Sequence, residues 1–247
     1  MQNHSTPLGI IAGSGHLPRE IAETCERSGR GCFIIALEGA ADVAAVHRFP
    51  HAVVRLGAAG ETLMHLKNAG VTEVVLAGGV KRPSMSSLKP DAVGAKLMAR
   101  LGLRLFSGDD ALLKALVGFF EEEGFRVIGA DDVVDGAVAP EGLIAGLRPD
   151  TMALQDIALG FKAAKALGAL DIGQAVIVEN GYVLGVEAAE GTDALIDRCA
   201  HLQRERGRAV LVKAMKPKQE ARADLPSIGP ETVRRLREAG MLGIAVE

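Results

Sequence analysis

Short apolar runs alternate with amphipathic segments along the first half of the chain. Continuous apolar runs of this kind are typical of strands that are buried on both faces of a parallel sheet. The predicted strands are Leu8–Ala12, Cys32–Leu37, Val53–Leu56, Val74–Ala77 and Phe125–Gly129. The predicted helices between them are Pro18–Ser28, Gly60–Ala69, Asp91–Leu103 and Asp109–Glu123. The alternation predicts an α/β domain with a parallel sheet.

The second half has a different pattern. A stretch rich in Gly and Pro, Gly136–Pro149, precedes it and reads as a linker. Its helices are predicted at Gln155–Leu167 and Asp193–Gln203, and its strands at Ala175–Glu179, Tyr182–Glu187 and Ala209–Lys213. Asn180-Gly181 joins the first two of these strands, and Asn-Gly is a strong signal for a tight hairpin. We therefore predict a first domain at 1–134, a linker at 135–149 and a mixed α/β domain at 150–247.

Composition narrows the class of protein. The chain has 247 residues, of which 48% are hydrophobic, so it has enough apolar material to fold. A net charge of −3 and the lack of Trp argue against a nucleic-acid binder. The N-terminus lacks the pattern of a signal peptide, and no apolar run approaches the ~20 residues of a membrane span. Three cysteines without C-x-x-C spacing, Cys25, Cys32 and Cys199, predict reduced and mostly buried thiols.

A glycine-rich turn follows the first predicted strand. Gly13-Ser14-Gly15 leads into a helix that opens near Pro18, and such helix N-termini attract phosphate. The third glycine of a dinucleotide fingerprint is missing, and Glu38 is the nearest acidic residue to the end of the second strand. This disfavours a nicotinamide-dependent reductase. A phosphate or sugar site and a simple tight turn both remain open.

A second glycine-rich turn follows the strand at Val74–Ala77. It reads Gly78-Gly79-Val80-Lys81-Arg82, and in open α/β sheets ligands bind beyond the carboxyl ends of the strands. The two glycines and two cations suit a diphosphate. A solvated turn with two surface cations is the alternative.

The most charged stretch lies near the C-terminus. Between His201 and Asp224 there are seven Lys or Arg residues against three acidic residues. Carboxylates that hold Mg²⁺ beside cations that take phosphate charge would suit a phosphate–metal site. On composition alone, a solvated charged loop is favoured. Carboxylates also precede a predicted helix at Glu187 and Glu190. Thr192 or Asp193 is expected to cap that helix, and capping is the favoured role for Asp193.

Other signals for chemistry are weak. His47 and His51 are four residues apart, but Phe49-Pro50 breaks a helix between them, so a zinc site is not expected. There is no G-x-S-x-G motif, and no Cys–His pair suggests a nucleophile.

Taken together, five blocks resemble one family. LGIIAGSGHLP, AGGVKRPS, GDDALL, LDIGQAVIVENGYVLGVEAAEGTD and KAMKPKQEARADLPSIGPETV occur in the order found in UDP-2,3-diacylglucosamine pyrophosphatases of the LpxI type. The similarity runs from Leu8 to about Ala245. Members extend by a further strand, helix and strand beyond the position of Gly243, whereas this chain ends at Glu247. We therefore expect an edge strand without its neighbour near the C-terminus.

The resemblance implies a fold and a reaction. The fold is a Rossmann-like domain followed by a mixed α/β domain, with the substrate between them. The reaction is hydrolysis of the pyrophosphate of UDP-2,3-diacylglucosamine to UMP and 2,3-diacylglucosamine 1-phosphate, a step of lipid A biosynthesis that uses Mg²⁺ or another divalent cation. Attack in this family falls on the β-phosphate. The alternative is a non-catalytic protein that binds a nucleotide sugar or lipid precursor.

The resemblance also implies site residues and surroundings. Asp224, in the D-L-P segment, is the expected catalytic residue and metal ligand. The expected substrate-binding residues are Gly13, Ser14, Gly15, Leu17, Pro18, Gly78, Gly79, Lys81, Arg82, Glu190, Gly191, Thr192, Lys213, Lys216, Gln219 and Arg222. A cytoplasmic protein is expected, with no nucleic-acid partner. Peripheral contact with the inner membrane and a homodimer are left open.

Overall fold

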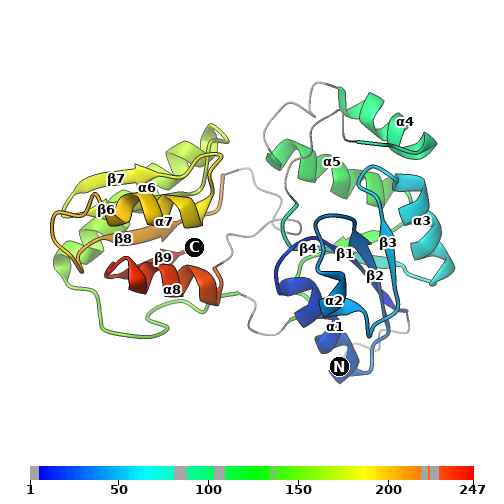
Figure 1. Cartoon of the computed structure of the whole chain (residues 1–247), viewed down its shortest axis with the longest axis horizontal. Helices are drawn as coiled ribbons and strands as arrows, with labels where there is room; N and C mark the ends of the chain where they lie inside the picture. Colours follow the sequence, from blue (N-terminus) through cyan, green and yellow to red (C-terminus); the bar gives the residue numbers. More distant parts are fainter. Residues whose placement is uncertain are drawn as a thin grey trace. The chain divides into compact units, whose positions relative to one another are not determined.

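The computed structural model describes residues 6–80, 88–102, 109–134, 136, 138–217, 222 and 228–247. The chain divides into two compact units (Figure 1). The first contains Met1–Val138 and Glu220–Asp224, and the second contains Ala139–Gln219 and Leu225–Glu247. The chain changes unit within the stretch that the sequence suggests as a linker. The assignment of Glu220–Asp224 to the first unit was not expected from the sequence.

The first unit is built on a five-stranded parallel sheet. Its strands lie in the order β3-β2-β1-β4-β5, so the order reverses between β1 and β4. The strands are β1 (Leu8–Ala12), β2 (Cys32–Leu37), β3 (His51–Val54), β4 (Glu73–Ala77) and β5 (Arg126–Ile128). The helices are α1 (Leu17–Ser28), α2 (Val43–Val46), α3 (Ala59–Asn68), α4 (Ala92–Leu101) and α5 (Asp109–Glu122). The predicted Rossmann-like α/β fold is confirmed.

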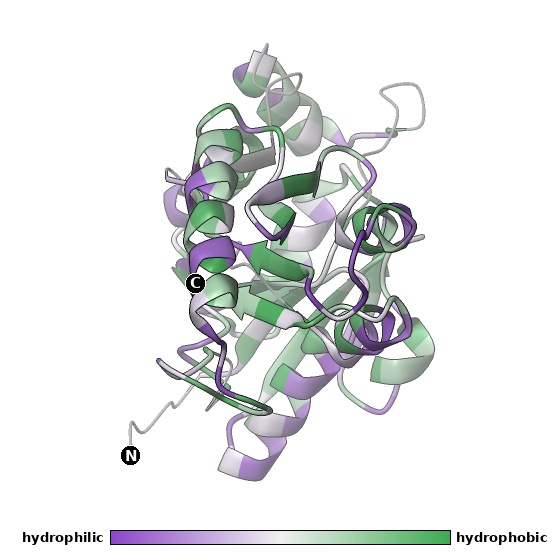
Figure 2. Cartoon of the chain, turned by 90° about the vertical axis from the view of Figure 1, so that its left-hand side faces the viewer, coloured by the Kyte–Doolittle hydropathy of each residue, from purple (hydrophilic) through white to green (hydrophobic). Residues whose placement is uncertain are grey.

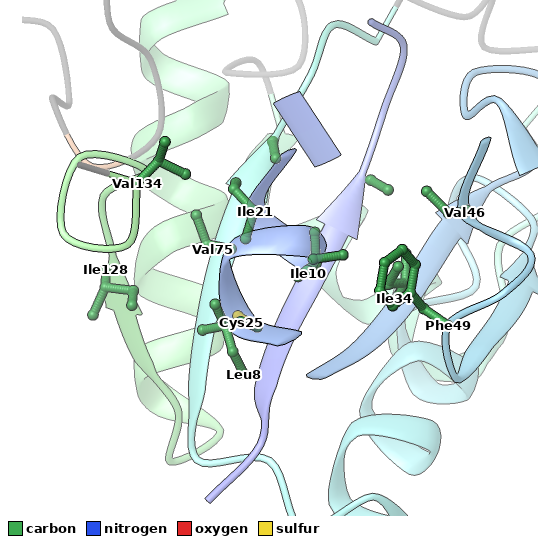
Figure 3. Packing of buried hydrophobic residues seen from close by; sticks show 13 residues of the cluster. Leu8, Ile10, Ile21, Cys25, Ile34, Val46, Phe49, Val75, Ile128 and Val134 are labelled. Atoms are coloured by element: carbon green, nitrogen blue, oxygen red, sulfur yellow. The ribbon is translucent and has the colours of Figure 1, made fainter. Parts of the chain in front are cut away.

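Hydrophobic residues cover both faces of this sheet. On one face, Ile21 and Cys25 of α1 pack over Leu8, Ile10 and other strand residues (Figure 3). The opposite face is covered by a second cluster that includes residues of α3 and α5. Successive strand residues point to opposite faces, so an entirely apolar strand serves both clusters. This explains why the strands read as uninterrupted apolar runs.

The ends of α1 follow from local sequence. Pro18 lies in the first turn, where its missing N–H leaves no helical bond unmade. Gly29 ends the helix in the left-handed conformation, with φ of 74°, and its backbone N–H is directed to the carbonyls of Cys25 and Glu26. These signals place the N-terminus of α1 directly after the first glycine-rich turn.

The second unit is built on a mixed four-stranded sheet with the order β7-β6-β8-β9. The strands are β6 (Ala175–Glu179), β7 (Tyr182–Val186), β8 (Val210–Lys213) and β9 (Gly243–Val246). Its helices are α6 (Thr151–Ala169), α7 (Thr192–Ala200) and α8 (Pro230–Glu238). Strand β6 is antiparallel to β7 and β8, whereas β8 and β9 are parallel. The predicted antiparallel pair is confirmed, and β9 lies at an edge of the sheet.

Two hydrophobic clusters cover the faces of this second sheet. Residues of α7 and α8, including Leu195, Ile196 and Leu236, pack on one face, and Ala164 of α6 packs on the other. Figure 2 looks onto this side of the protein and shows green, hydrophobic strands among helices with purple, hydrophilic segments. The unit therefore has a core of its own.

A buried carboxylate fixes the β6–β7 hairpin. Asn180 and Gly181 have positive φ angles of 49° and 80°, as a tight hairpin turn of this kind requires. Asp156 of α6 is only 1% exposed. Its two carboxylate oxygens accept hydrogen bonds from the backbone N–H groups of Asn180 and Gly181, at 2.8 and 2.6 Å. The turn is thus held by a residue that packs against the sheet from α6.

The three cysteines form no disulfide, as predicted. Cys25 and Cys199 are buried and Cys32 is partly buried. Burial, with the nearby Cys25 and Glu26, raises the pKa of the Cys32 thiol to about 11. A thiol with so high a pKa is a poor nucleophile at neutral pH. Within the described residues, no helix is both long enough and apolar enough to cross a membrane.

Candidate functional site: the carboxyl edges of the two sheets

Four chain segments leave the first sheet at the same level of its carboxyl edge. Ala12 pairs with Ala36 and with Ala77, and Leu37 pairs with Val54. One or two residues beyond these pairs lie Arg55, Glu38, Ser14 and Gly79, in the order of the strands, and all four line one pocket. We call these four residues the cross-strand row. The row crosses the point between β1 and β4 where the strand order reverses, which is where open α/β sheets bind ligands.

The two glycine-rich turns pair directly with each other. The backbone N–H of Ser14 donates to the carbonyl of Gly79 at 2.8 Å, and the N–H of Gly79 donates to the carbonyl of Ser14 at 3.1 Å. A Cβ atom on Gly13 would overlap the backbone of Gly79, and one on Gly78 would overlap Ser14. These glycines are therefore required by the close approach of the two turns. Gly15, by contrast, has φ of 94° and open space around it.

A pocket lies over the cross-strand row. Its volume is about 730 Å³, which is in the usual range for ligand pockets. The residues that line it are Ser14, Glu38, Gly39, Ala40, Arg55, Leu56, Gly79, Val80, Leu88 and Lys89. The side chains of Glu38, Arg55 and Lys89 form no hydrogen bond or ion pair within the described part of the chain. Two cations and one carboxylate thus line one pocket, and none of them has a side-chain partner among the described residues.

The wall that carries Lys89 is held by Asp91. One oxygen of Asp91 accepts from the N–H of Gly94 at 2.7 Å, at the start of α4, and the other accepts from the N–H of Glu61 at 3.0 Å, in the first turn of α3. Burial acts to raise the pKa of Asp91, but these backbone donors outweigh it and lower that pKa. An ionised Asp91 therefore caps two helices and fixes the segment just after Lys89.

The second sheet also gathers charged residues at one edge. Strands β7, β8 and β9 run in the same direction, so Glu187 after β7 and Lys213 at the end of β8 lie at the same edge. Glu187 is 7% exposed and accepts a hydrogen bond from the Thr192 hydroxyl at 2.6 Å. The Lys213 ammonium donates to the Thr192 oxygen at 3.2 Å. We call Glu187, Thr192 and Lys213 the Glu187 network.

Lys216 and Glu190 also lie at this edge and have partners. The Lys216 ammonium forms an ion pair with Asp171 at 2.5 Å. Glu190 accepts a hydrogen bond from the Arg198 guanidinium at 2.8 Å. Its own backbone N–H and the Arg198 guanidinium lower the pKa of Glu190. The charged residues at this edge are fixed by internal pairing.

One local prediction is wrong. Asp193 does not cap α7, because the helix begins one residue earlier than predicted, at Thr192, and its N-cap is Gly191. Asp193 instead lies in the first turn, where it forms an ion pair with Arg235 of α8 at 3.6 Å. Gly191 has φ of 82°, which glycine adopts more readily than Asp.

The structure places the predicted site residues in several groups. Gly13, Ser14, Gly78 and Gly79 come together in the paired turns, with Gly15, Leu17 and Pro18 leading into α1. Thr192 and Lys213 come together in the Glu187 network, beside Gly191. Arg222 belongs to the first unit, where its guanidinium donates to Glu121 at 2.6 Å. Lys81, Arg82, Gln219 and Asp224 lie outside the described residues.

The predicted metal ligand, Asp224, lies outside the described residues, so the metal site stays a prediction. No three His, Cys, Asp or Glu residues within the described ranges are grouped so that they could hold an ion. Mg²⁺ commonly binds through one or two carboxylates, substrate phosphates and water, and does not need a cage of protein ligands. The donor set proposed for it, Asp224 and the diphosphate, is of that kind.

Two charged residues that line this pocket, Arg55 and Lys89, are not among the residues predicted from the sequence. Glu38 enters the sequence analysis only as a possible ligand of a dinucleotide cofactor. Arg55 directly follows β3, and Glu38 directly follows β2. Glu38 lies just beyond the predicted strand Cys32–Leu37, so a search for charged residues after predicted strands finds it. Arg55 lies inside the predicted strand Val53–Leu56 and follows β3 only because that strand ends at Val54.

The fold and the two edges define a class of protein: a two-unit α/β protein with a Rossmann-like first unit and a pocket at its switch point. Models of the LpxI N-terminal domain and the LpxI C-terminal domain match residues 7–137 and 140–247. The chain is 43% identical over 246 residues to a protein of Caulobacter vibrioides named UDP-2,3-diacylglucosamine pyrophosphatase LpxI. The match covers 97% of this chain and 88% of that protein. The chain belongs to the LpxI family.

Proposed function

We propose that this protein hydrolyses the diphosphate of UDP-2,3-diacylglucosamine to UMP and 2,3-diacylglucosamine 1-phosphate. The observation that carries the proposal is the match to both LpxI domains together with 43% identity over 97% of the chain to a relative named for this substrate. The pocket at the switch point of the first sheet supports it, because such positions bind nucleotides in many α/β proteins.

The chemistry requires neutralisation of the diphosphate charge. Negative charge on the phosphates repels an incoming nucleophile, so a site for their hydrolysis needs cations and a way to hold water. Lys213, Lys216 and Arg222 are the cations proposed to bind the phosphate oxygens. Each charge-assisted hydrogen bond of this kind contributes about 1.5–3 kcal/mol. Because the Glu187 network already holds the Lys213 side chain, that cation is in place before substrate binds.

Asp224 is the proposed catalytic residue. Its carboxylate is suited to hold the attacking water or a divalent cation. A bound Mg²⁺ would supply additional charge neutralisation at the phosphates. Water attacks the β-phosphorus, the bond from that phosphorus to the bridging oxygen breaks, and the bridging oxygen leaves with UMP.

The two ends of the substrate differ in what they need. The nucleotide half suits Gly15, the start of α1 and the turn that continues into Lys81 and Arg82. Each buried methylene of the acyl chains is worth about 0.8 kcal/mol, so the other half requires apolar surface. A cytoplasmic location, peripheral contact with the inner membrane and a homodimer remain predictions.

The experiment is to incubate the full chain with UDP-2,3-diacylglucosamine and Mg²⁺ and to measure UMP by chromatography. UMP release by the wild-type protein and its loss in Asp224→Asn, with substrate binding retained, are expected. Asp131, which is exposed in the first unit, provides a matched control. The same change there, Asp131→Asn, is expected to leave UMP release unchanged. Thermal stabilisation by the substrate without UMP release at any metal concentration would instead indicate a binding protein.

A further inference from the structure

We propose that the pocket of the first unit is a ribonucleotide site in which Glu38 accepts hydrogen bonds from the ribose hydroxyls, while Arg55 and Lys89 neutralise the phosphate. The choice of uridine as the base rests on the proposed function. The assignment of ribose and phosphate rests on the residues that line the pocket.

Glu38 is placed to recognise a group with hydroxyls. It directly follows β2, next to the strand that leads into the first glycine-rich turn, and its backbone N–H is fixed by a bond to the Val54 carbonyl at 2.9 Å. Its side chain is exposed and has no partner within the described residues. An ionised carboxylate only accepts hydrogen bonds, so its natural ligand is a donor such as a sugar hydroxyl. A carboxylate after the second strand has this role in many Rossmann-type sites.

Arg55 and Lys89 give the same pocket an excess of positive charge. Arg55 is the neighbour of Glu38 in the cross-strand row, yet the two side chains form no ion pair. Lys89 lines the pocket from the segment that Asp91 holds. Several other arginines that the structure describes in this unit form ion pairs, as Arg30 does with Glu73 at 2.7 Å and Arg100 does with Glu122 at 2.6 Å. The two cations that face the pocket are thus available to an anion.

The turn beside this pocket favours a mononucleotide half over a nicotinamide dinucleotide. In the dinucleotide fingerprint a third glycine lets α1 pack closely on the sheet, and here that position is Pro18. Gly13 is already in contact with Gly79, so the backbone space it leaves is filled by the second turn and not by a pyrophosphate. Gly15 remains the open position of the turn.

The test measures binding to the purified full chain by calorimetry, without metal and without turnover. The ligands are UMP, 2′-deoxy-UMP and uridine. The wild-type protein is expected to bind UMP about tenfold or more tightly than 2′-deoxy-UMP, as loss of one charge-assisted hydrogen bond implies. Glu38→Ala should weaken UMP binding more than 2′-deoxy-UMP binding, because 2′-deoxy-UMP lacks one of the hydroxyls that Glu38 binds.

The cations have a separate readout. Arg55→Ala and Lys89→Ala are each expected to weaken UMP binding about five- to tenfold and to leave uridine binding unchanged, because uridine has no phosphate. Glu141→Ala and Arg148→Ala are the matched controls. Both side chains are exposed in the second unit and line no part of this pocket, so UMP binding should be unaffected.

Three results would overturn the inference: equal binding of UMP and 2′-deoxy-UMP by the wild-type protein, equal losses for both ligands in Glu38→Ala, or binding of NADH in preference to UMP. Failure here is distinct from failure of the proposed function. A chain that releases UMP from UDP-2,3-diacylglucosamine but ignores Glu38 refutes only this site. A chain that selects ribose through Glu38 but hydrolyses nothing refutes only the proposed reaction.

Discussion

The carboxyl edges of the two sheets carry similar charged residues, but these residues differ in whether their side chains have partners. At the first edge, Glu38, Arg55 and Lys89 line a pocket and have no side-chain partners within the described residues. At the second edge, Lys213 and Lys216 are held by Thr192 and Asp171. At the first edge, direct backbone hydrogen bonds also join the two glycine-rich turns.

The difference indicates how each edge is prepared for a ligand. A rigid backbone with unpaired charges suits recognition, because the ligand supplies the missing partners without moving the chain. A network that holds a cation before substrate binds suits charge stabilisation, because little reorganisation is then needed during the reaction. The predictions below test the two edges separately.

The largest effect is expected from Gly78→Ala at the first edge. The new Cβ overlaps Ser14, and Gly78 has φ of 86°, which Ala adopts only with strain. We expect a loss of roughly 3 kcal/mol in the free energy of unfolding. The chain has no Trp, so circular dichroism in urea is the suitable measurement.

Gly70→Ala is the matched control. Gly70 also has a positive φ, of 70°, but a Cβ there meets nothing within 4 Å. Gly70→Ala should lower the free energy of unfolding only by the cost of a positive φ angle for Ala, about 1–2 kcal/mol. Equal losses in the two variants would show that the contact between the turns adds no constraint.

An intermediate effect is expected from Glu187→Ala at the second edge. The Thr192 hydroxyl and the N–H of Gln174, which donates to Glu187 at 3.0 Å, both lose their acceptor. The expected loss is about 2–3 kcal/mol in the free energy of unfolding, together with lower kcat. Glu187→Gln keeps an acceptor oxygen and should recover part of the stability. If Glu187→Ala lowers neither stability nor kcat, the network does not hold Lys213.

The smallest effect is expected from Asp91→Ala, which loosens the wall beside Lys89. Two helix N-termini lose their cap, at about 1–2 kcal/mol in total at pH 7. The pKa of Asp91 is lowered in the folded protein, so its contribution is present above the unfolded value of about 3.9 and is lost as the pH falls through the folded value. The difference from wild type should therefore shrink in acid. A difference that stays constant from pH 7 down through that range would exclude the ionised carboxylate as its source.

Local signals in the sequence were sufficient for most of the fold. The strands Leu8–Ala12, Cys32–Leu37 and Ala175–Glu179 lie where their apolar runs predict, and Asn180-Gly181 forms the predicted hairpin turn. Helix α8 and strand β9 were not predicted. Leu236 is the buried residue of α8, so that helix gives little hydrophobic pattern. Strand β9 is an apolar run as long as β8, so the sequence could have predicted it.

The site was harder to predict, because its geometry depends on contacts between distant residues. The pairing of Ser14 with Gly79 joins residues 65 positions apart, and nothing in either turn alone indicates it. From the sequence alone, Asp156 is an ordinary polar residue of an amphipathic helix. Its hydrogen bond to the hairpin turn exists only because α6 packs on the sheet. Arg55 can be recognised as a candidate site residue only from the strand pairing that brings it close to Glu38.

The central claim is that this protein hydrolyses UDP-2,3-diacylglucosamine by attack of water at the β-phosphorus. It is tested most directly by incubating the full chain with this substrate and Mg²⁺ in ¹⁸O-labelled water and measuring the masses of both products by mass spectrometry. The account predicts unlabelled UMP and 2,3-diacylglucosamine 1-phosphate that carries one ¹⁸O atom from the solvent. Intact substrate after prolonged incubation with active, folded protein would contradict the account, and ¹⁸O in UMP would contradict attack at the β-phosphorus.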